Sequence, residues 1–310
     1  MQLVRNINIQ AFFNIERKDK MKSKYRLNGD VVLGIILTIF GIIVLYPFYN
    51  ALLVSLVPQH VYVKTPFMFF PKEISFDSYK FVFSNDALMG GVKVTVIVLI
   101  FGVLYNMLLT ALTAYAMTKA IPGKKFIMYC IIFTMYFGGG LIPFYLLIKD
   151  LGLMNNIAAM ILPTGFNAVY MIIIKSFFED LPIELEESAK IDGANDLVVL
   201  FKIILPLSLP ILATFSLYYS VERWNEWWNG MLFIRSIDKQ PLQLVLRTIV
   251  QDASEFIDQA SASQASNEVT IFADGIKMAS IIATMMPVMC LFPFLQKYFV
   301  KGLTVGAVKS

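Results

Sequence analysis

One acidic segment, DLPIELEESAKIDGAND over residues 180–196, combines residue types that build a rigid protein-docking element. Pro182 fits the first turn of a helix, and the glutamates that follow are favourable near a positive helix N-terminus. Gly193 suits the left-handed conformation that ends many helices, and Asn195 or Asp196 can cap a second helix. A solvated acidic connector needs none of these signals. We therefore predict a helix–turn–helix aimed at the membrane that serves as a docking surface.

A second candidate site is the segment RWNEWWN over residues 223–229, which holds all three tryptophans. Aromatic faces beside hydrogen-bonding groups are suited to binding sugars. The candidate contacts with a sugar or with an extracellular binding protein are Trp224, Trp227, Trp228 and Asn229. An aromatic belt at the membrane interface explains the same residues without any ligand. Both interpretations stay open.

A third set of residues interrupts apolar stretches with glycine or polar groups. The candidates for a cavity or hinge are Gly138, Gly139, Gly140, Asn106 and Tyr170, with Pro143, Tyr105 and Asn167 beside them. Broken helices often line substrate sites in transporters. Small residues also allow close helix packing, and intramembrane amides often hydrogen-bond between helices. Neither alternative is excluded.

The remaining reactive residues argue against an enzyme. The only histidine is His60, which disfavours histidine-based metal sites and catalytic triads. Cys130 and Cys290 lie in apolar runs, so we expect buried small side chains rather than a disulfide or a metal pair. The ATP-binding pattern GxxxxGK[ST] does not occur. We expect no catalytic residue, no bound metal and no cofactor in this chain.

The composition indicates that lipid is the solvent for most of these elements. Of 310 residues, 57% are apolar and 15% are charged, against about 25% charged in soluble domains. The mean hydropathy is +0.67. One soluble core of this size cannot hide so much apolar surface. The net charge of +4 does not indicate a nucleic-acid partner.

Stretches free of Asp, Glu, Lys and Arg predict the membrane spans, since about 20 apolar residues cross the hydrocarbon layer. Six stretches are long enough, and they give approximate spans over 31–57, 94–118, 126–148, 151–174, 203–221 and 278–296. The predicted fold is therefore an all-α integral membrane protein with six transmembrane helices.

Basic residues predict the orientation of these spans in the cell membrane. With the N-terminus inside, the inside segments carry 16 of the 26 Lys and Arg residues, and the outside segments carry ten. Both termini are then cytoplasmic: a basic tail over 1–30, whose true start is Met1 or Met21, and a tail over 297–310. The two long connections are an inside loop over 175–202 and an outside loop over 222–277, within which 251–266 is polar.

The inside loop also carries a family resemblance. The residues Glu187-Ser188-Ala189, then Gly193 after three residues, then Ile203-x-Leu205-Pro206 after nine more, match the spacing of the EAA motif of ABC importer permeases. Serine replaces the second residue of that motif. The chain resembles the carbohydrate-uptake branch, among maltose-type permeases, in a subgroup that imports oligosaccharides. This resemblance implies the type I importer (MetI-like) fold.

The resemblance also implies a mechanism and partners. The helix before Gly193 would sit in a cleft of a cytoplasmic ATPase, with Glu187, Ser188, Ala189, Gly193, Ile203, Leu205 and Pro206 as the coupling residues. ATP and Mg²⁺ would be bound by two ATPase subunits, not by this chain. A second, homologous permease would complete a heterodimer, and an extracellular binding protein would deliver the oligosaccharide, whose identity the sequence does not reveal.

Two other classes of membrane protein fit less well. A secondary transporter usually needs acidic or histidine side chains at membrane depth, and the six predicted spans contain no Asp or Glu. A membrane enzyme needs clustered catalytic groups at the end of a span. Glu222 and Glu226 follow the fifth span without a histidine or a metal-binding spacing nearby.

Overall fold

The computed structural model describes residues 31–65, 68–251, 272 and 274–290. Within these ranges the regular secondary structure is entirely helical, so the predicted all-α fold class is confirmed. The predicted terminal tails, residues 252–271 with most of the polar outside stretch, and the end of the sixth predicted span after 290 lie outside the described residues.

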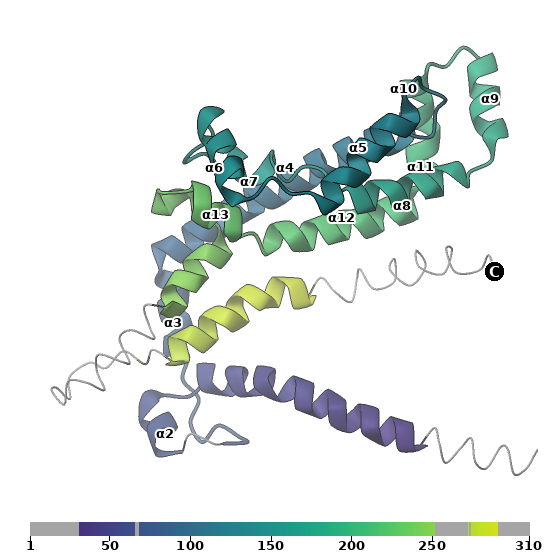
Figure 1. The fold of residues 1–310 in the computed structure, drawn as a ribbon. Helices are drawn as coiled ribbons and strands as arrows, with labels where there is room; N and C mark the ends of the chain where they lie inside the picture. Colours follow the sequence, from purple (N-terminus) through teal and green to yellow (C-terminus); the bar gives the residue numbers. More distant parts are fainter. Residues whose placement is uncertain (1–30, 66–67, 252–271, 273, 291–310) are drawn as a thin grey trace, which may run out of the picture.

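Most of the described helices follow one another along the chain with short connections (Figure 1). In order they are Val31–Ser55, α2 (Gln59–Lys64), α3 (Asp77–Ser84), α4 (Asp86–Ala116), α5 (Lys124–Tyr136), α6 (Leu141–Asp150), α7 (Ala158–Ile161), α8 (Ala168–Glu179), α9 (Ile183–Ile191), α10 (Asp196–Val199), the π-helix η1 (Leu200–Ile204), α11 (Leu205–Leu207), α12 (Leu209–Trp224), α13 (Trp228–Phe233), the 3₁₀ helix η2 (Ile237–Lys239), Leu242–Gln251 and a helix over 274–290.

Helix α4 is the axis of the bundle, with α8 and α12 packed along it. It starts at a strong cap, since the Asn85 side chain accepts hydrogen bonds from the backbone N–H groups of Ala87 and Leu88 at 3.0 and 3.2 Å. Glycines let neighbours approach closely: a Cβ atom added to Gly102 would lie 2.9 Å from Cδ of Arg223. The glycine therefore makes room for a charged side chain inside the bundle.

Buried apolar side chains join the helices at both ends of α4. Toward its C-terminus, one cluster combines α4, α8, α10, η1 and α12: Ala114, Tyr115, Met117, Met171, Ile174, Phe178, Val199, Leu200, Ile204, Ile211 and Phe215. Toward its N-terminus, Val94 and Val98 pack against Met160 and Ile234. The predicted inside loop is therefore connected to the bundle through a continuous apolar core.

The helix Val31–Ser55 exposes most of its large apolar side chains, which water would not tolerate over 25 residues. Among the described residues, it and α4 are long and apolar enough to cross a membrane. The number rises to four if each of two bent helix pairs forms one span. A multi-pass membrane protein is therefore supported, and the count of six spans stays a prediction.

The helix bounds differ from the charge-free stretches in physically understandable ways. Helix α4 begins at its cap, several residues before the charge-free part starts. The third predicted span is bent by 114° between α5 and α6, where glycines replace the helix. The fourth is interrupted between α7 and α8, and α8 continues to Glu179. Absence of charge marks what lipid tolerates, whereas caps and breaks mark where helices start and end.

The expectation of buried cysteines was wrong. Cys130 on α5 and Cys290 at the end of the helix over 274–290 are both exposed on the surface of the chain. In a membrane protein, apolar side chains also face lipid or a neighbouring subunit, so an apolar run does not imply burial within the chain.

Candidate functional sites

Helix α9 is the predicted docking helix, and it stands apart from the bundle at one end of the molecule (Figure 1). Pro182 is its N-cap residue, one position before the first turn. Gly193 adopts a φ of +84°, as the sequence predicted. Its N–H donates to the Lys190 carbonyl at 3.0 Å, and the Ala194 N–H donates to the Ala189 carbonyl at 2.9 Å. This pair of bonds is the Schellman arrangement that ends a helix sharply.

The Glu186 carboxylate anchors α9 to its surroundings. It accepts a hydrogen bond from Lys119, which precedes α5, and pairs with Lys190 at 2.8 Å; Lys190 also pairs with Asp196 at 3.1 Å. Partial burial alone would raise the pKa of Glu186, but the bonds from Lys119 and Lys190 outweigh it and lower this pKa. Hydrogen bonds to Glu186 and Asp196 raise the pKa of Lys190.

Helix α9 carries exposed apolar and polar side chains that suit a protein partner. Ile183, Leu185 and Ile191 are 65%, 40% and 86% exposed. Glu187 and Ser188 are also exposed, whereas Ala189 packs against the cluster below. Apolar side chains held in solvent on a rigid helix indicate an interaction surface.

A second helical segment follows the glycine turn, as predicted. The Asn195 side chain caps it by accepting from the Val198 N–H at 2.9 Å. Ile203 lies in η1, and Leu205 and Pro206 lie in α11. The chain then bends by 85° at Ser208 into α12. The EAA-like residues thus form one continuous path from α9 into the bundle.

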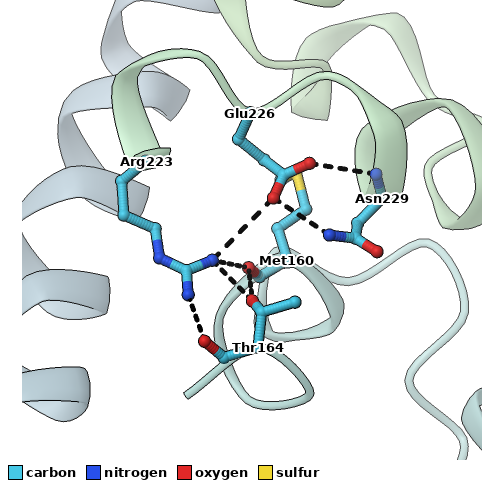
Figure 2. A network of polar contacts seen from close by, with 5 residues as sticks. All are labelled: Met160, Thr164, Arg223, Glu226 and Asn229. Atoms are coloured by element: carbon cyan, nitrogen blue, oxygen red, sulfur yellow. Dashed lines mark hydrogen bonds and ion pairs between the residues drawn. The ribbon is translucent and has the colours of Figure 1, made fainter. Parts of the chain in front are cut away.

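The arginine at the end of α12 is the centre of a buried polar network (Figure 2). Arg223 is 2% exposed. Its Nη1 donates to the Met160 carbonyl at 2.7 Å and to Thr164 Oγ1 at 2.6 Å, and its Nη2 donates to the Thr164 carbonyl at 2.5 Å. Glu226 lies 3.8 Å away and accepts two bonds from Asn229, at 3.0 and 2.9 Å. The network joins α12 and α13 to the break after α7.

The tryptophan segment divides into residues with different surroundings. Trp224 packs in a core and donates to the Thr284 carbonyl at 3.3 Å, and Asn229 is buried in the arginine network. Trp227 and Trp228 stack edge to face with ring centroids 5.4 Å apart, and Arg247 lies 4.3 Å over the Trp227 ring. Trp228 remains 45% exposed. Of the four candidates, Trp228 is the exposed one, and Trp227 is partly buried, as Trp224 is.

The glycine triplet is the place where α5 ends and the chain turns into α6. Gly140 has a φ of +92°, which favours glycine, and added Cβ atoms on Gly138 and Gly139 would have nothing within 4 Å. Among the described residues, the triplet is thus a turn rather than a packing contact. Whether it moves during transport stays a prediction.

Three of the polar candidates inside the bundle form hydrogen bonds: Asn106, Asn167 and Tyr170. With its amide oriented to satisfy both neighbours, Asn106 donates to the Gly102 carbonyl at 2.8 Å and accepts from Arg223 Nη2 at 2.9 Å. Asn167 caps α8 through Val169 and Tyr170. The Tyr170 hydroxyl donates to Glu222 Oε1 at 2.6 Å. Asn106 therefore joins two packed helices, Asn167 caps the start of α8, and Tyr170 bonds to an exposed acid.

Comparison with known proteins identifies the family. Residues 94–305 match the binding-protein-dependent transport system inner membrane component family. The chain belongs to this family. It is 39% identical over 93% of its length, and the whole of the relative, to the polygalacturonan/rhamnogalacturonan transport system permease protein YtcP of Bacillus subtilis. It is 38% identical to protein LplC of the same organism over 87% of this chain and 91% of LplC.

A solved structure supports the same assignment. A bacterial ABC transporter involved in the import of the acidic polysaccharide alginate contains a chain with a TM-score of 0.79 and 32% identity. The match covers 88% of this chain and 97% of that one. The predicted importer-permease family and its fold are thus confirmed, and members of this family are transport components rather than enzymes.

Two ion pairs of this permease were not predicted from the sequence. Arg223 and Glu226 stand three residues apart directly after an apolar span, which is the signal that would have indicated a buried pair. Lys119 and Glu186 are 67 residues apart, and their pairing had no local signal. The sequence also missed Asn155, whose Oδ1 accepts from the Arg235 and Ser236 N–H groups at 3.2 and 3.0 Å. It fixes the connection before α7 to the segment after α13.

Proposed function

We propose that this permease is a membrane subunit of an ATP-driven oligosaccharide importer. The main support is α9, an ordered helix with exposed apolar side chains that is continuous, through η1 and α11, with the bundle. The family is defined by dependence on a binding protein. YtcP is a permease protein of a polygalacturonan/rhamnogalacturonan transport system, and the solved transporter is involved in the import of alginate. These relatives favour plant- or algal-type oligosaccharides as the substrate here.

The coupling residues in this proposal are Glu187, Ser188, Ala189, Gly193, Ile203, Leu205 and Pro206. A partner ATPase would hold α9, with ATP and Mg²⁺ bound in the partner. Closure of two ATPase subunits would move α9 as a rigid unit, because Gly193 and the Glu186 contacts fix it. The bend at Ser208 would pass that movement to α12, which packs on α4. The spans would then alternate between inward and outward openings.

The proposed topology places both termini in the cytoplasm. The two predicted inside loops support this, because Lys119 of one loop contacts Glu186 of the other and both therefore lie at one end of the bundle. The outside end would meet the extracellular binding protein. A second homologous permease would complete the translocation path, since the exposed apolar helix Val31–Ser55 needs lipid or a neighbouring subunit around it.

Reconstitution tests this function directly. The chain is co-expressed with its candidate ATPase, a second permease and a binding protein, and the assembly is inserted into liposomes. We expect co-purification, ATP hydrolysis stimulated by the sugar-loaded binding protein, and ATP-dependent uptake of an oligosaccharide from a panel of pectin and alginate fragments. Sugar uptake by this chain alone, without ATP, would refute the proposal.

A further inference from the structure

The connection between η1 and α12 lacks several of the hydrogen bonds of a regular α-helix. The Leu205 N–H donates to the Leu200 carbonyl, five residues back, so η1 forms a π-turn instead of an α-turn. Pro206 and Pro210 have no N–H group, so two further α-helical bonds cannot form. The chain bends by 85° within this segment. Helices bend at π-turns and prolines, and π-turns are frequent at functional sites.

Ser208 stands at the bend with a buried hydroxyl group that has no partner. The residue is 0% exposed, and its Oγ forms no hydrogen bond with any described residue. Ser208 is also the N-cap residue of α12, where a serine oxygen normally accepts from a backbone N–H of the first helical turn. That cap bond is not formed. A buried hydroxyl without a partner destabilises the conformation that leaves it unpaired.

The backbone of Ser208 explains why the cap bond is not formed. Its ψ of 10° lies outside the extended region that N-cap residues typically adopt. Its N–H is shared between the carbonyls of Ile204 and Leu205, at 3.0 and 3.1 Å, which ties Ser208 to the helix before the bend. In α12 the second residue is Pro210, so the N–H of Ile211 is the donor that a capping serine would bind. One backbone rotation therefore controls both the cap and the bend.

An apolar cavity beside this segment leaves room for such a rotation. Its volume is about 200 Å³, and it lies between α4 and the segment that runs from η1 to α12. Protein interiors are otherwise close-packed, so a change of backbone angle needs free space next to it. The lining residues are Leu104, Met107, Leu108, Ala111, Leu112, Leu200, Phe201, Leu205 and Leu212.

We infer that Ser208 is a positioning residue of the coupling path, and this inference rests on the proposed function. Rotation of its ψ into the extended region brings its hydroxyl to the Ile211 N–H and changes the angle between η1 and α12. We call residues 200–208 the joint. The unpaired hydroxyl disfavours the present angle of the joint, and the cap bond favours a second angle. Movement of α9 by the ATPase thus reaches α12 through a joint with two preferred angles.

The distance between two spin labels measures the angle of the joint. The labels are placed on Leu197→Cys in α10 and Val221→Cys in α12, both exposed, in a Cys130→Ser/Cys290→Ser background. In the complete importer in liposomes we expect two distance populations, whose ratio changes when ATP and vanadate trap the ATPase. Ser208→Ala removes the cap bond of the second angle. It should shift the ratio about fivefold toward the population that matches the 85° bend, the effect of losing one helix cap.

Ser280→Ala is the matched control. Ser280 is also 0% exposed, and its hydroxyl has no partner among the described residues, but it lies in the helix over 274–290, outside the joint. Removing either hydroxyl should leave the thermal unfolding midpoint unchanged or slightly higher. Only Ser208→Ala should raise, several-fold, the number of ATP molecules hydrolysed per sugar imported. A distance ratio in Ser208→Ala equal to that of the wild type would overturn the inference, as would an equal shift in Ser280→Ala.

Filling the cavity tests the joint from the side of α4. Leu108→Trp places an indole against the joint, so we expect a single distance. Ile100→Trp, at an exposed position of α4 outside the cavity lining, should keep both. A single distance in a wild-type importer that hydrolyses ATP and takes up sugar would count against the joint alone. Failure to bind an ATPase, with both distances present in the chain by itself, would count against the proposed function instead.

Discussion

Lys119 and Glu186 form an ion pair that joins the connection before α5 to the docking helix α9, across 67 residues of sequence. Both side chains are about four-fifths buried, at 21% and 19% exposure. Lys119 also lies 4.0 Å over the ring of Tyr115, which belongs to the core at the end of α4. The pair therefore connects α9 to the bundle by a route other than the continuous chain through η1.

Reversing the charges of this pair tests its role in coupling. Lys119→Glu and Glu186→Lys should each lower ATP-driven uptake about fivefold, because a partly exposed ion pair contributes about 1 kcal/mol. The double variant should recover most of the loss if the two side chains act as a pair. Lys80→Ala, which removes an exposed ion pair with Asp77 elsewhere in the chain, serves as the control. Equal losses in the single and double variants would contradict the pairing role.

The same network predicts a defined pH range for the anchored helix. The pKa of Glu186 is lowered from 4.5, so its stabilising effect is present above that value and is lost as the pH falls toward its lower, folded-state pKa. The pKa of Lys190 is raised from 10.5, so its effect persists below that value and is lost only at higher pH. A spin label on Ser188→Cys, in a Cys130→Ser/Cys290→Ser background, should keep constant mobility between these limits.

Glu186→Gln provides the control for that measurement. It removes the titrating carboxylate, so the label should be more mobile at neutral pH and should lose the transition on the acid side. An acid transition of unchanged size in Glu186→Gln would assign the effect to another group.

Gly193 offers a test of the turn that follows α9. Alanine at a φ of +84° costs about 1 kcal/mol or more from its own backbone, and the space around the residue is open, so steric conflict adds nothing. We expect Gly193→Ala to reduce uptake several-fold with normal insertion into the membrane. Gly193→Asn should be milder, since asparagine adopts this conformation more readily. Equal activity of the alanine variant and the wild type would show that the turn is not required.

Substituting Arg223 should lower the stability of the folded protein rather than remove a contact with a ligand. Arg223→Ala leaves the Thr164 and Met160 acceptors and the Glu226 carboxylate without their buried cation, which costs about 3–5 kcal/mol. Arg223→Lys should recover little, because an ammonium group cannot reproduce the planar set of bonds. Thermal unfolding in detergent measures the effect. Arg247→Ala, an exposed arginine on Trp227, should change the midpoint far less.

Substituting Trp227 distinguishes a contact with a ligand from a role at the membrane interface. Trp227→Ala should lower uptake more than it lowers the amount of inserted protein if the ring contacts sugar or the binding protein. Trp224→Ala, which removes a ring packed in the core, should instead lower the inserted amount. Unchanged uptake with Trp227→Ala would leave the aromatic belt as the role of this residue.

The docking segment was predictable because its signals are local. A glycine in the left-handed conformation and an asparagine cap act within a few residues, so Gly193 and Asn195 have the same roles in the sequence and in the structure. The break before α8 and the bend of 114° between α5 and α6 were not predictable from charge-free length. Hydropathy records whether lipid tolerates a segment, and it does not record where a helix bends.

The sequence by itself determined the solvent, the helical fold class, the family and the position of α9, because composition and short-range spacing carry that information. Only the tertiary structure decided that Glu186 pairs with Lys119, that Arg223 is buried while Glu222 beside it is exposed, and that Tyr170 reaches that acid. Successive residues on a helix point in directions about 100° apart. Which of two adjacent charges enters the core therefore depends on the helices that pack against them.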